Sequence, residues 1–386
     1  MSAASPAIDA RRAEALESFR VRGMPHRRFE HWKYSDLRAV LDAGQVAQAG
    51  TAAWQIENPP DGVELFDLAT PADAPSWVVK YLGAVGNRPT MKEASLAFAD
   101  GGVALRVAAG RKIAQPLRLQ ISSPGNTRVL IVLEDGAALS VMETHADDAG
   151  QLRNVGVEIA LGKGATLRHV RCGTHAPKSI VIEHIAVALL GDAQYRAHFA
   201  NFGARLSRTE LHIVLQEKGA QAHLAGVGVL GSDVHSDVTS HIEHAAGDTQ
   251  STQLFKNVVG GKSRGVYQGK ITVREGANGS DSRQTAKAIL LGTHAEADLK
   301  PELVIFADDV KCAHGAAVGD LDAESLFYLC SRGIPEKEAR NLLVRAFVEE
   351  AVAEIEDETL RAEVWSDVEK ALPRALGHDR LMGLFS

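Results

Sequence analysis

The sequence predicts an all-β core, built as a parallel β-helix and flanked by α-helical regions at the N- and C-termini. The first observation is a glycine that recurs every 26 to 29 residues, at Gly110, Gly136, Gly164, Gly191, Gly219, Gly247 and Gly276. The second is that short runs of alternating apolar residues lie between these glycines, and such alternation places apolar side chains on one face of a strand. A fixed period with turn glycines and no helical pattern is typical of a solenoid whose stacked coils bury one continuous core.

The alternating runs identify the side chains that should point into this core. They are Val157, Ile159, Leu161, Ile185, Val187, Leu189, Leu211, Ile213, Leu215, Ile271 and Val273. We therefore divide the chain into an N-terminal helical region with a connector (1–95), the β-helix (96–320) and a C-terminal helical domain (321–386).

Composition and charge narrow the class of protein. Aromatic residues make up 5% of the chain and glycines number 35, which suits a stacked β architecture. The net charge of −7 is spread along the chain without a basic block. Nucleic-acid binding is therefore disfavoured, because phosphate contacts need clustered lysines and arginines.

The N-terminus and the cysteines indicate the compartment. The first residues, MSAASPAIDARRAEALESF, lack the apolar segment of a signal peptide, and no run reaches the roughly 18 apolar residues of a membrane span. Three cysteines (Cys172, Cys312 and Cys330) are too few for a disulfide framework. We expect a cytoplasmic protein with reduced thiols and no membrane contact.

Helical patterns occupy the start of the chain. Residues 9–22 have charged and apolar residues at helical spacing, and the pattern ends near Gly23. In the stretch 27–41, Trp32, Leu37 and Leu41 can share one side of a helix that packs on the core. Residues 44–95 are rich in proline and alanine, and we expect a loosely regular connector with one short helix.

The C-terminal region predicts three helices. Asp322 is suited to cap a helix over 323–332 that ends at Gly333. Pro335 fits the first turn of a second helix. The third carries an apolar stripe of Leu360, Val364, Val368 and Leu372. The stripe either packs on the solenoid or binds a partner.

Two local patterns resemble ligand sites but have simpler explanations. GGKS at 260–263 is similar to the end of a phosphate loop, yet the required glycine at position 256 is Lys256, and the strand-to-helix context is missing. His184, His212 and His241 recur nearly in repeat register. Stacking of equivalent positions predicts such a ladder, and a metal stripe is the alternative.

Cys172 lies near His169 and His175 in the sequence. A soft-metal site is one interpretation. A buried thiol that behaves as a small apolar side chain is the other, and we favour it.

The strongest local motif is the pair Cys312 and His314. Residues two apart on a strand point to the same face, and thiolate and imidazole are both good ligands for iron or zinc. Two ligands do not close a metal site, so a second chain would have to complete it. Asp308, Asp309 and Lys311 nearby suggest a different reading, in which a β-helix enzyme cleaves polysaccharides.

Several stretches resemble the SufB/SufD family, which consists of scaffold components of the SUF iron–sulfur cluster assembly machinery. EHWKYSDL (30–37) is similar to the N-terminal motif of SufD-type members, and the chain has too few cysteines for the motifs common in SufB-type members. The other matching blocks are ASLAFADGGVALRVAAG (94–110), SDSRQTAKAILLGTHAEADLKPELVIFADDVKCAHG (280–315) and LFYLCSRGIPEKEARNLLVRAF (326–347).

The resemblance implies a right-handed parallel β-helix that forms a heterodimer with SufB and docks the ATPase SufC through the C-terminal region. It makes His314, and after it Cys312, candidate metal residues for an iron–sulfur cluster held transiently at the SufB interface. Leu343 and Phe347 become candidate SufC-docking residues. The resemblance implies a non-catalytic scaffold with no cofactor in the isolated chain, which could pair with itself. It leaves flavin binding open, and Cys330 receives no role.

The alternative function is a β-helix polysaccharide lyase or hydrolase that uses Asp308, Asp309 and Lys311. The absence of an apolar leader counts against it, because polymer substrates are usually outside the cell. The scarcity of aromatic residues also counts against it, because sugar-binding surfaces favour aromatic platforms.

Overall fold

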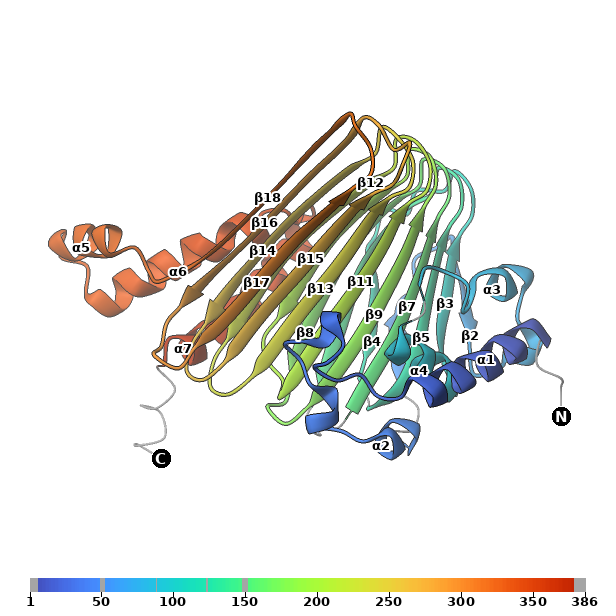
Figure 1. Ribbon diagram of the computed structural model, residues 1–386, viewed down its shortest axis with the longest axis horizontal. Helices are drawn as coiled ribbons and strands as arrows, with labels where there is room; N and C mark the ends of the chain where they lie inside the picture. The colour runs from blue at the N-terminus through green and yellow to red at the C-terminus, as the bar shows by residue number, and fades with distance from the viewer. Residues whose placement is uncertain (1–5, 49–52, 88, 123, 148–151, 378–386) are drawn as a thin grey trace.

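A computed structural model describes residues 6–48, 53–87, 89–122, 124–147 and 152–377. Most of the chain forms two long sheets that face one another (Figure 1). The first, here called the β18 sheet, has the order β1 (Trp54–Glu57), β4 (Leu117–Ile121), β6 (Ala138–Asp147), β8 (Thr166–His175), β10 (Gln194–Asn201), β12 (Gln221–Leu230), β14 (Gln250–Val259), β16 (Ser280–Leu290) and β18 (Val310–Gly319).

The second sheet, here called the β17 sheet, supplies the other strand of each coil. Its order is β17 (Glu296–Ile305), β15 (Arg264–Val273), β13 (His235–His244), β11 (Leu206–Leu215), β9 (Ile180–Leu189), β7 (Leu152–Leu161), β5 (Gly125–Leu133), β3 (Gly102–Val107) and β2 (Val63–Asp67). From β3 onward, neighbouring strands within a sheet run parallel, while β1 and β2 join antiparallel. This arrangement is the predicted parallel β-helix.

The interior between the sheets is the main apolar core. Every side chain predicted to point inward is buried, and Ile213 and its register partner Val187 are fully enclosed. Because paired residues in parallel strands share a face, each apolar position stacks on its equivalent in the next coil. The prediction of the inward faces is therefore confirmed.

The turns between strands need a residue in the left-handed backbone conformation, and they supply it in two ways. Gly136 and Gly164 adopt the left-handed conformation, with φ of +67° and +62°. At the equivalent turns beginning with Gly191 and Gly247, the following aspartates Asp192 and Asp248 adopt it instead, with φ of +56° and +50°. Aspartate tolerates this conformation because its short side chain can form hydrogen bonds with the nearby backbone. The turn geometry is therefore kept even where the left-handed residue is not glycine.

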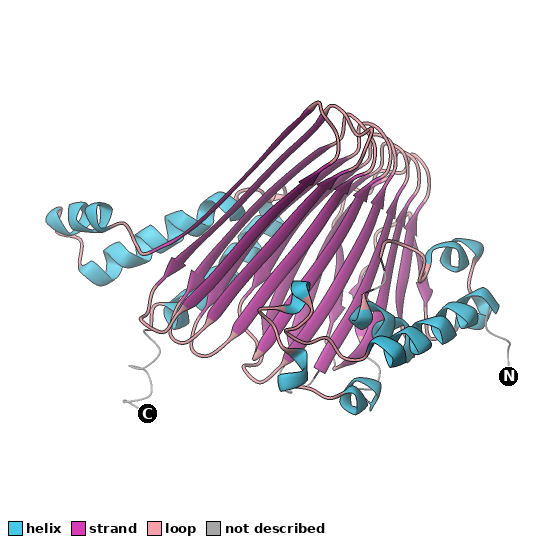
Figure 2. Ribbon diagram, in the orientation of Figure 1, coloured by secondary structure: helices cyan, strands magenta, loops and turns pink. Residues whose placement is uncertain are grey.

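The N-terminal region covers the outer face of the β17 sheet (Figure 2). It contains the helices α1 (Pro6–Arg22), α2 (Ala43–Gln48), α3 (Ser76–Tyr81) and α4 (Thr90–Phe98), with 3₁₀ turns at Glu30–Trp32, Leu37–Ala39 and Pro71–Asp73. The predicted helix over 27–41 is wrong, because two 3₁₀ turns replace it, although Trp32, Leu37 and Leu41 are buried as expected. The prediction of a loose connector after residue 44 is also wrong, since that stretch supplies β1, β2 and three helices.

The C-terminal helices lie on the opposite side of the solenoid. They are α5 (Ala323–Ser331), α6 (Glu336–Val352) and α7 (Glu358–Ala375). Asp322 caps α5 by accepting the Ser325 N–H at 2.8 Å, and Gly333 follows it in the left-handed conformation, as predicted. The stripe of α7 packs with α6 on the outer face of the β18 sheet, while α5 projects away from it (Figure 1). Within the described ranges, no helix is long and apolar enough to cross a membrane.

Candidate functional site

The last coil of the solenoid leaves its end open. Strand β18 pairs with β16 on one edge, and no described strand lies on its other edge. Most residues of β17 and β18 are exposed or half-buried, whereas the matching positions of the inner coils are buried. Ile305, Phe306 and Val318 are large apolar side chains that face solvent here, with Phe306 65% exposed. An unpaired edge with exposed apolar side chains is a template for another chain.

Cys312 and His314 lie on this last strand and share its inward-facing side. Their register partners on β16 are Ser282 and Gln284, both buried inside the solenoid. Because partners in parallel strands point the same way, the predicted common face is confirmed. Cys312 is half-buried, and His314 is exposed at the open end.

The two side chains differ in their readiness to bind metal. Burial raises the pKa of the Cys312 thiol, and the neighbouring carboxylate of Asp281 raises it further. A thiol with a raised pKa forms less thiolate, which is the ligand form. Within the described residues, no further histidine, cysteine or carboxylate joins this pair to make a group of three. The pair is therefore half of a metal site at most.

The structure places the three proposed lyase residues on the exposed last coil. Asp308 and Asp309 lie on the exposed turn between β17 and β18, where the Asp309 carbonyl accepts the Gly279 N–H at 2.7 Å. Lys311 points outward from β18, in register with Asp281. None of the three is among the residues that line five of the pockets in the described part of the molecule.

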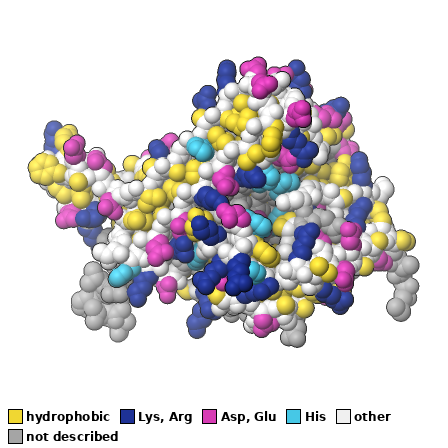
Figure 3. Space-filling view, viewed as in Figure 1, with side chains coloured by type: hydrophobic (Ala, Val, Ile, Leu, Met, Phe, Trp, Pro, Cys, Tyr) yellow, Lys and Arg dark blue, Asp and Glu magenta, His cyan; other side chains and the backbone are white. Residues whose placement is uncertain are grey.

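The predicted histidine ladder is correct for two of its three members. His212 and His241 are register partners with ring centroids 5.2 Å apart. His184 pairs with Glu210 instead, two residues away from the ladder position. All three line a cavity of about 360 Å³ between the N-terminal region and the β17 sheet, and histidines surround a hollow on this face in Figure 3.

The histidines of this cavity are neutral but do not converge on one point. Burial lowers the pKa of His212 to about 4 and holds that of His184 well below its ordinary value. The His212 Nδ1 accepts the Asn87 N–H at 3.2 Å, and the His241 Nε2 bonds the Thr272 hydroxyl at 2.9 Å. His212 and His241 thus each engage one ring nitrogen with a different partner, which favours the stacking interpretation over a metal stripe.

A polar cluster inside the solenoid escaped the sequence analysis. Glu143, His145 and Glu183 bring their donor atoms within 4.8 Å of one another in the fully buried interior. Arg171 pairs with Glu183 at 3.0 Å, and His169 bonds Glu143 at 3.0 Å. Arg171 thus neutralises Glu183, while the imidazoles of His145 and His169 hydrogen-bond Glu143. Only the pairing of distant strands shows it, because its members come from β6, β8 and β9.

The remaining sequence candidates have structural roles. Cys172 faces outward and donates its thiol hydrogen to Asp367 on α7 at 3.3 Å, and burial raises its pKa strongly. His169 and His175 face inward from the same strand, so the three cannot share a metal. The GGKS stretch makes the turn between β14 and β15, where Gly260 packs against the backbone of Ala375.

The surface around α5 is the most apolar exposed part of the C-terminal region. Phe327 is 75% exposed, and Tyr328 and Leu342 are also exposed. Leu343 is half-buried and, together with residues of α5, lines an open pocket of about 640 Å³. Phe347 packs against the solenoid, and the Lys256 ammonium lies 4.7 Å from its ring centroid while bonding its carbonyl oxygen. Of the two residues predicted from the sequence, Leu343 thus lies on this surface and Phe347 lies behind it, while the exposed aromatic residues Phe327 and Tyr328 were not predicted.

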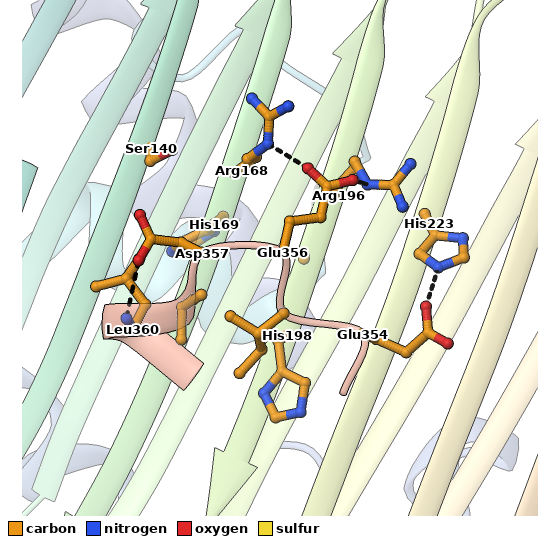
Figure 4. A pocket seen from close by; sticks show the side chains of 13 residues that line it. Ser140, Arg168, His169, Arg196, His198, His223, Glu354, Glu356, Asp357 and Leu360 are labelled. Carbon is orange, nitrogen blue, oxygen red and sulfur yellow. Dashed lines mark hydrogen bonds and ion pairs between the residues drawn. The ribbon is translucent and has the colours of Figure 1, made fainter. Parts of the chain in front are cut away.

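The turn between α6 and α7 is clasped to the β18 sheet by ion pairs (Figure 4). Glu356 bonds Arg168 at 2.6 Å and Arg196 at 2.8 Å, while Glu354 bonds His223 at 2.6 Å. The space enclosed beneath the turn is only about 30 Å³, enough for one or two waters. These contacts hold the helices in place and leave no room for a ligand.

Comparisons with known proteins agree with this architecture. The family model described as SUF system FeS cluster assembly, SufBD core domain, matches residues 120–347, and the SufBD protein N-terminal region matches residues 1–59. The iron–sulfur cluster assembly protein SufD of Escherichia coli is 28% identical over 91% of this chain and 90% of its own length.

SufBD family proteins of other bacteria are similar to the same extent. The relative in Synechocystis sp. is 28% identical over 89% of this chain and 86% of its own length. The relative in Mycobacterium tuberculosis is 28% identical over 96% of both chains. With its β-helix between helical regions and its matches along nearly the whole length, this chain belongs to the SufBD family of iron–sulfur cluster assembly proteins.

Proposed function

We propose that the chain is a non-catalytic scaffold subunit that pairs with SufB through the open end of its solenoid and docks the ATPase SufC through the surface around α5. In this proposal, the seam is the contact between β18 and the SufB chain. His314 contributes a ligand to a cluster site at this seam, and Cys312 is the second candidate ligand. The observation that supports it best is the open last coil, which carries an exposed metal-ligand pair on its inward face.

Pairing with a paralogue would remove the defect of the open end. An equivalent strand beside β18 would satisfy its free backbone groups, and the partner's last coil would cover Ile305, Phe306 and Val318. A SufB chain of the same family has a solenoid of the same kind to offer. A second copy of this chain could form the same contact, so the isolated protein could dimerise.

The seam would complete the half-site. The cluster is the cargo of assembly, and thiolates and imidazoles are suitable ligands for its iron. His314 is exposed toward the seam, whereas the raised pKa of Cys312 makes its thiolate less available at neutral pH. The partner would supply the remaining ligands, which explains why this chain needs only one or two.

The test of the seam is a His314→Ala variant, with Cys312→Ser beside it. We expect His314→Ala to keep the melting temperature and SufB binding while lowering cluster assembly in cells, and Cys312→Ser to have a weaker effect. Lys311→Ala, which changes the outward face of the same strand, is the matched control.

Both association and cluster formation must be measured on each variant. If His314 only packs the interface, its replacement weakens SufB binding in proportion to any loss of clusters. Normal cluster formation with His314→Ala would remove the ligand role from this proposal.

Docking of SufC is tested by the double variant Phe327→Ser, Tyr328→Ser. Neither side chain is buried, so the fold should be unaffected while SufC binding falls by at least tenfold, as expected for aromatic residues that anchor an interface. A deletion from Asp322 is a poorer test, because α6 and α7 cover an apolar face of the solenoid. Glu363→Gln on α7 is the control. SufC binding that is unchanged in size-exclusion chromatography would place the docking surface elsewhere.

A further inference from the structure

Polar side chains on three successive strands form a row that leads inward from the open end of the solenoid at β18. His314 on β18, Gln284 on β16 and Gln253 on β14 are successive register partners on the inward face of the β18 sheet. Gln284 is 1% exposed and Gln253 is also buried, while His314 is exposed. Adjacent parallel strands lie about 4.8 Å apart, so the side chain below His314 is within reach of its ring.

The two glutamines belong to one hydrogen-bond network. The Gln284 amide nitrogen donates to the Tyr267 hydroxyl oxygen at 3.0 Å. The Tyr267 hydroxyl in turn donates to Gln253 Oε1 at 3.0 Å, and the Ser240 hydroxyl donates to the same oxygen at 2.6 Å. Each amide atom has one role in this chain, because an amide oxygen can only accept and an amide nitrogen can only donate, whereas the Tyr267 hydroxyl does both.

This directionality determines which way the Gln284 amide faces. Because Gln253 Oε1 accepts the Tyr267 proton, the Tyr267 oxygen accepts from the Gln284 NH₂ group. The Gln253 amide nitrogen is buried without a partner among the described residues. Gln284 Oε1 therefore points away from Tyr267, and it has no hydrogen-bond partner among the described residues. A buried carbonyl oxygen without a donor is uncommon in folded proteins and costly to leave unpaired.

The site is shaped to hold this amide. Gly269 lies beside it, and a Cβ at that position would overlap the Gln284 amide nitrogen. The Gln284 amide thus occupies space that is available only because residue 269 is glycine. The next coil, where the unpaired oxygen could find a donor, is β18, and its residue at this position is His314.

We propose that Gln284 is a positioning residue for His314, whose ring N–H donates to Gln284 Oε1. This hydrogen bond would set the tautomer of the neutral ring and leave the lone pair of the other nitrogen facing the seam. Metal-binding histidines in proteins commonly have such a partner on their second nitrogen. The inference rests on the proposed cluster role for its purpose, but the hydrogen bond itself is testable without a cluster.

The experiment compares two isosteric variants of the full-length chain, with histidines labelled with ¹⁵N. Gln284→Met keeps the volume and removes the acceptor below His314, while Gln253→Met disturbs the same network one coil deeper. The His314 signals are assigned by their loss in His314→Ala. At a pH where the ring is neutral, we expect one His314 tautomer to be favoured about fivefold or more in the parent chain, the bias that one ordinary hydrogen bond supports.

The expected result is that Gln284→Met brings the tautomer ratio to that of an exposed histidine. Gln253→Met removes the acceptor of the Tyr267 proton, so the Gln284 amide can turn over and the bias should be lost or reversed. Gln284→Glu, which retains an acceptor oxygen, should restore the bias. An unchanged ratio in Gln284→Met would overturn the inference, and an unchanged ratio in Gln253→Met would overturn the orientation assigned to the Gln284 amide.

Cluster assembly in cells separates this inference from the proposed function. Assembly lowered in both Gln284→Met and His314→Ala supports both. A shifted tautomer ratio together with normal assembly in both variants supports the hydrogen bond and overturns the cluster role. An unchanged ratio together with lowered assembly in His314→Ala overturns the positioning role and leaves the cluster role in place.

Discussion

A single buried arginine, Arg208, joins the N-terminal segment around Trp32 to the solenoid. Arg208 on β11 is fully buried, pairs with Asp237, and bonds Glu210 at 2.6 Å. Its guanidinium also lies 4.1 Å from the centroid of the Trp32 ring and donates to the His31 carbonyl oxygen at 2.6 Å. One side chain thus neutralises two carboxylates and holds the segment around the 3₁₀ turns against the sheet.

Replacing Arg208 with Met should strongly destabilise the protein. The change leaves Asp237 and Glu210 without their main cation in a buried setting, and breaking such a pair costs about 3–5 kcal/mol. Chemical denaturation measures the loss. Lys218→Met is the control, because its ion pair with Asp248 is exposed and its removal should leave the denaturation midpoint unchanged. Equal midpoints for the two variants would show that the Arg208 network contributes no stability.

Among the elements, the C-terminal helices depend on two kinds of contact. The apolar faces of α6 and α7 bury Val344, Val348, Leu360 and Val364 against the β18 sheet. The turn between them adds ion pairs through Glu356, and hydrogen bonding from Arg168 lowers the pKa of that carboxyl. The apolar contacts supply most of the stability, because partly exposed ion pairs contribute little.

A Glu356→Gln variant should therefore loosen α7 slightly without unfolding the solenoid. We expect amide hydrogen exchange in α7 to rise about two- to fivefold, which corresponds to about 0.5–1 kcal/mol for the lost pairs. Glu358→Gln, at the first residue of α7, is the control, because its carboxylate is almost fully exposed and makes only a 3.8 Å ion pair with Arg361. If exchange in α7 matches the parent in both variants, the ion pairs of Glu356 contribute nothing to the stability of α7.

At the scale of the whole molecule, burial of neutral histidines couples folding to pH. The chain contains 15 histidines, and burial lowers the pKa of His145, His175, His184, His198, His212, His235, His241 and His244. The unfolded chain binds protons at these sites near pH 6.5, whereas the folded chain binds them only at lower pH. The stability that these neutral histidines contribute is therefore fully present above about pH 6.5 and is lost as the pH falls.

His198 offers a test of this coupling. Burial under the C-terminal helices lowers its pKa to about 4, so its contribution should disappear between about pH 6.5 and that value. We expect the unfolding free energy of the parent to fall over this range and the slope to be smaller in His198→Asn. His294→Asn, at an exposed position, should keep the parental slope. A slope unaffected by His198→Asn would contradict the assignment of this histidine as a buried neutral group.

The sequence by itself determined the coils and their inward faces, whereas the stretch 302–314, which reads as one last strand, is divided between β17 and β18 by a turn. Its glycine period and two-residue alternation are local signals, and stacking converts them directly into parallel register, as Ile213 on Val187 shows. Cys312 and His314 were found for the same reason, because a spacing of two on a strand is a local property.

Only the tertiary structure decided what surrounds those residues. The register of β18 on β16 places His314 over Gln284, the interior cluster joins Glu143 to Glu183 across the two sheets, and His184 lies outside the ladder. The aromatic side chains of α5 are exposed because that helix projects from the solenoid, which no helical pattern reveals. Each of these depends on pairing between segments distant in sequence, and residue spacing within one segment carries no information about that pairing.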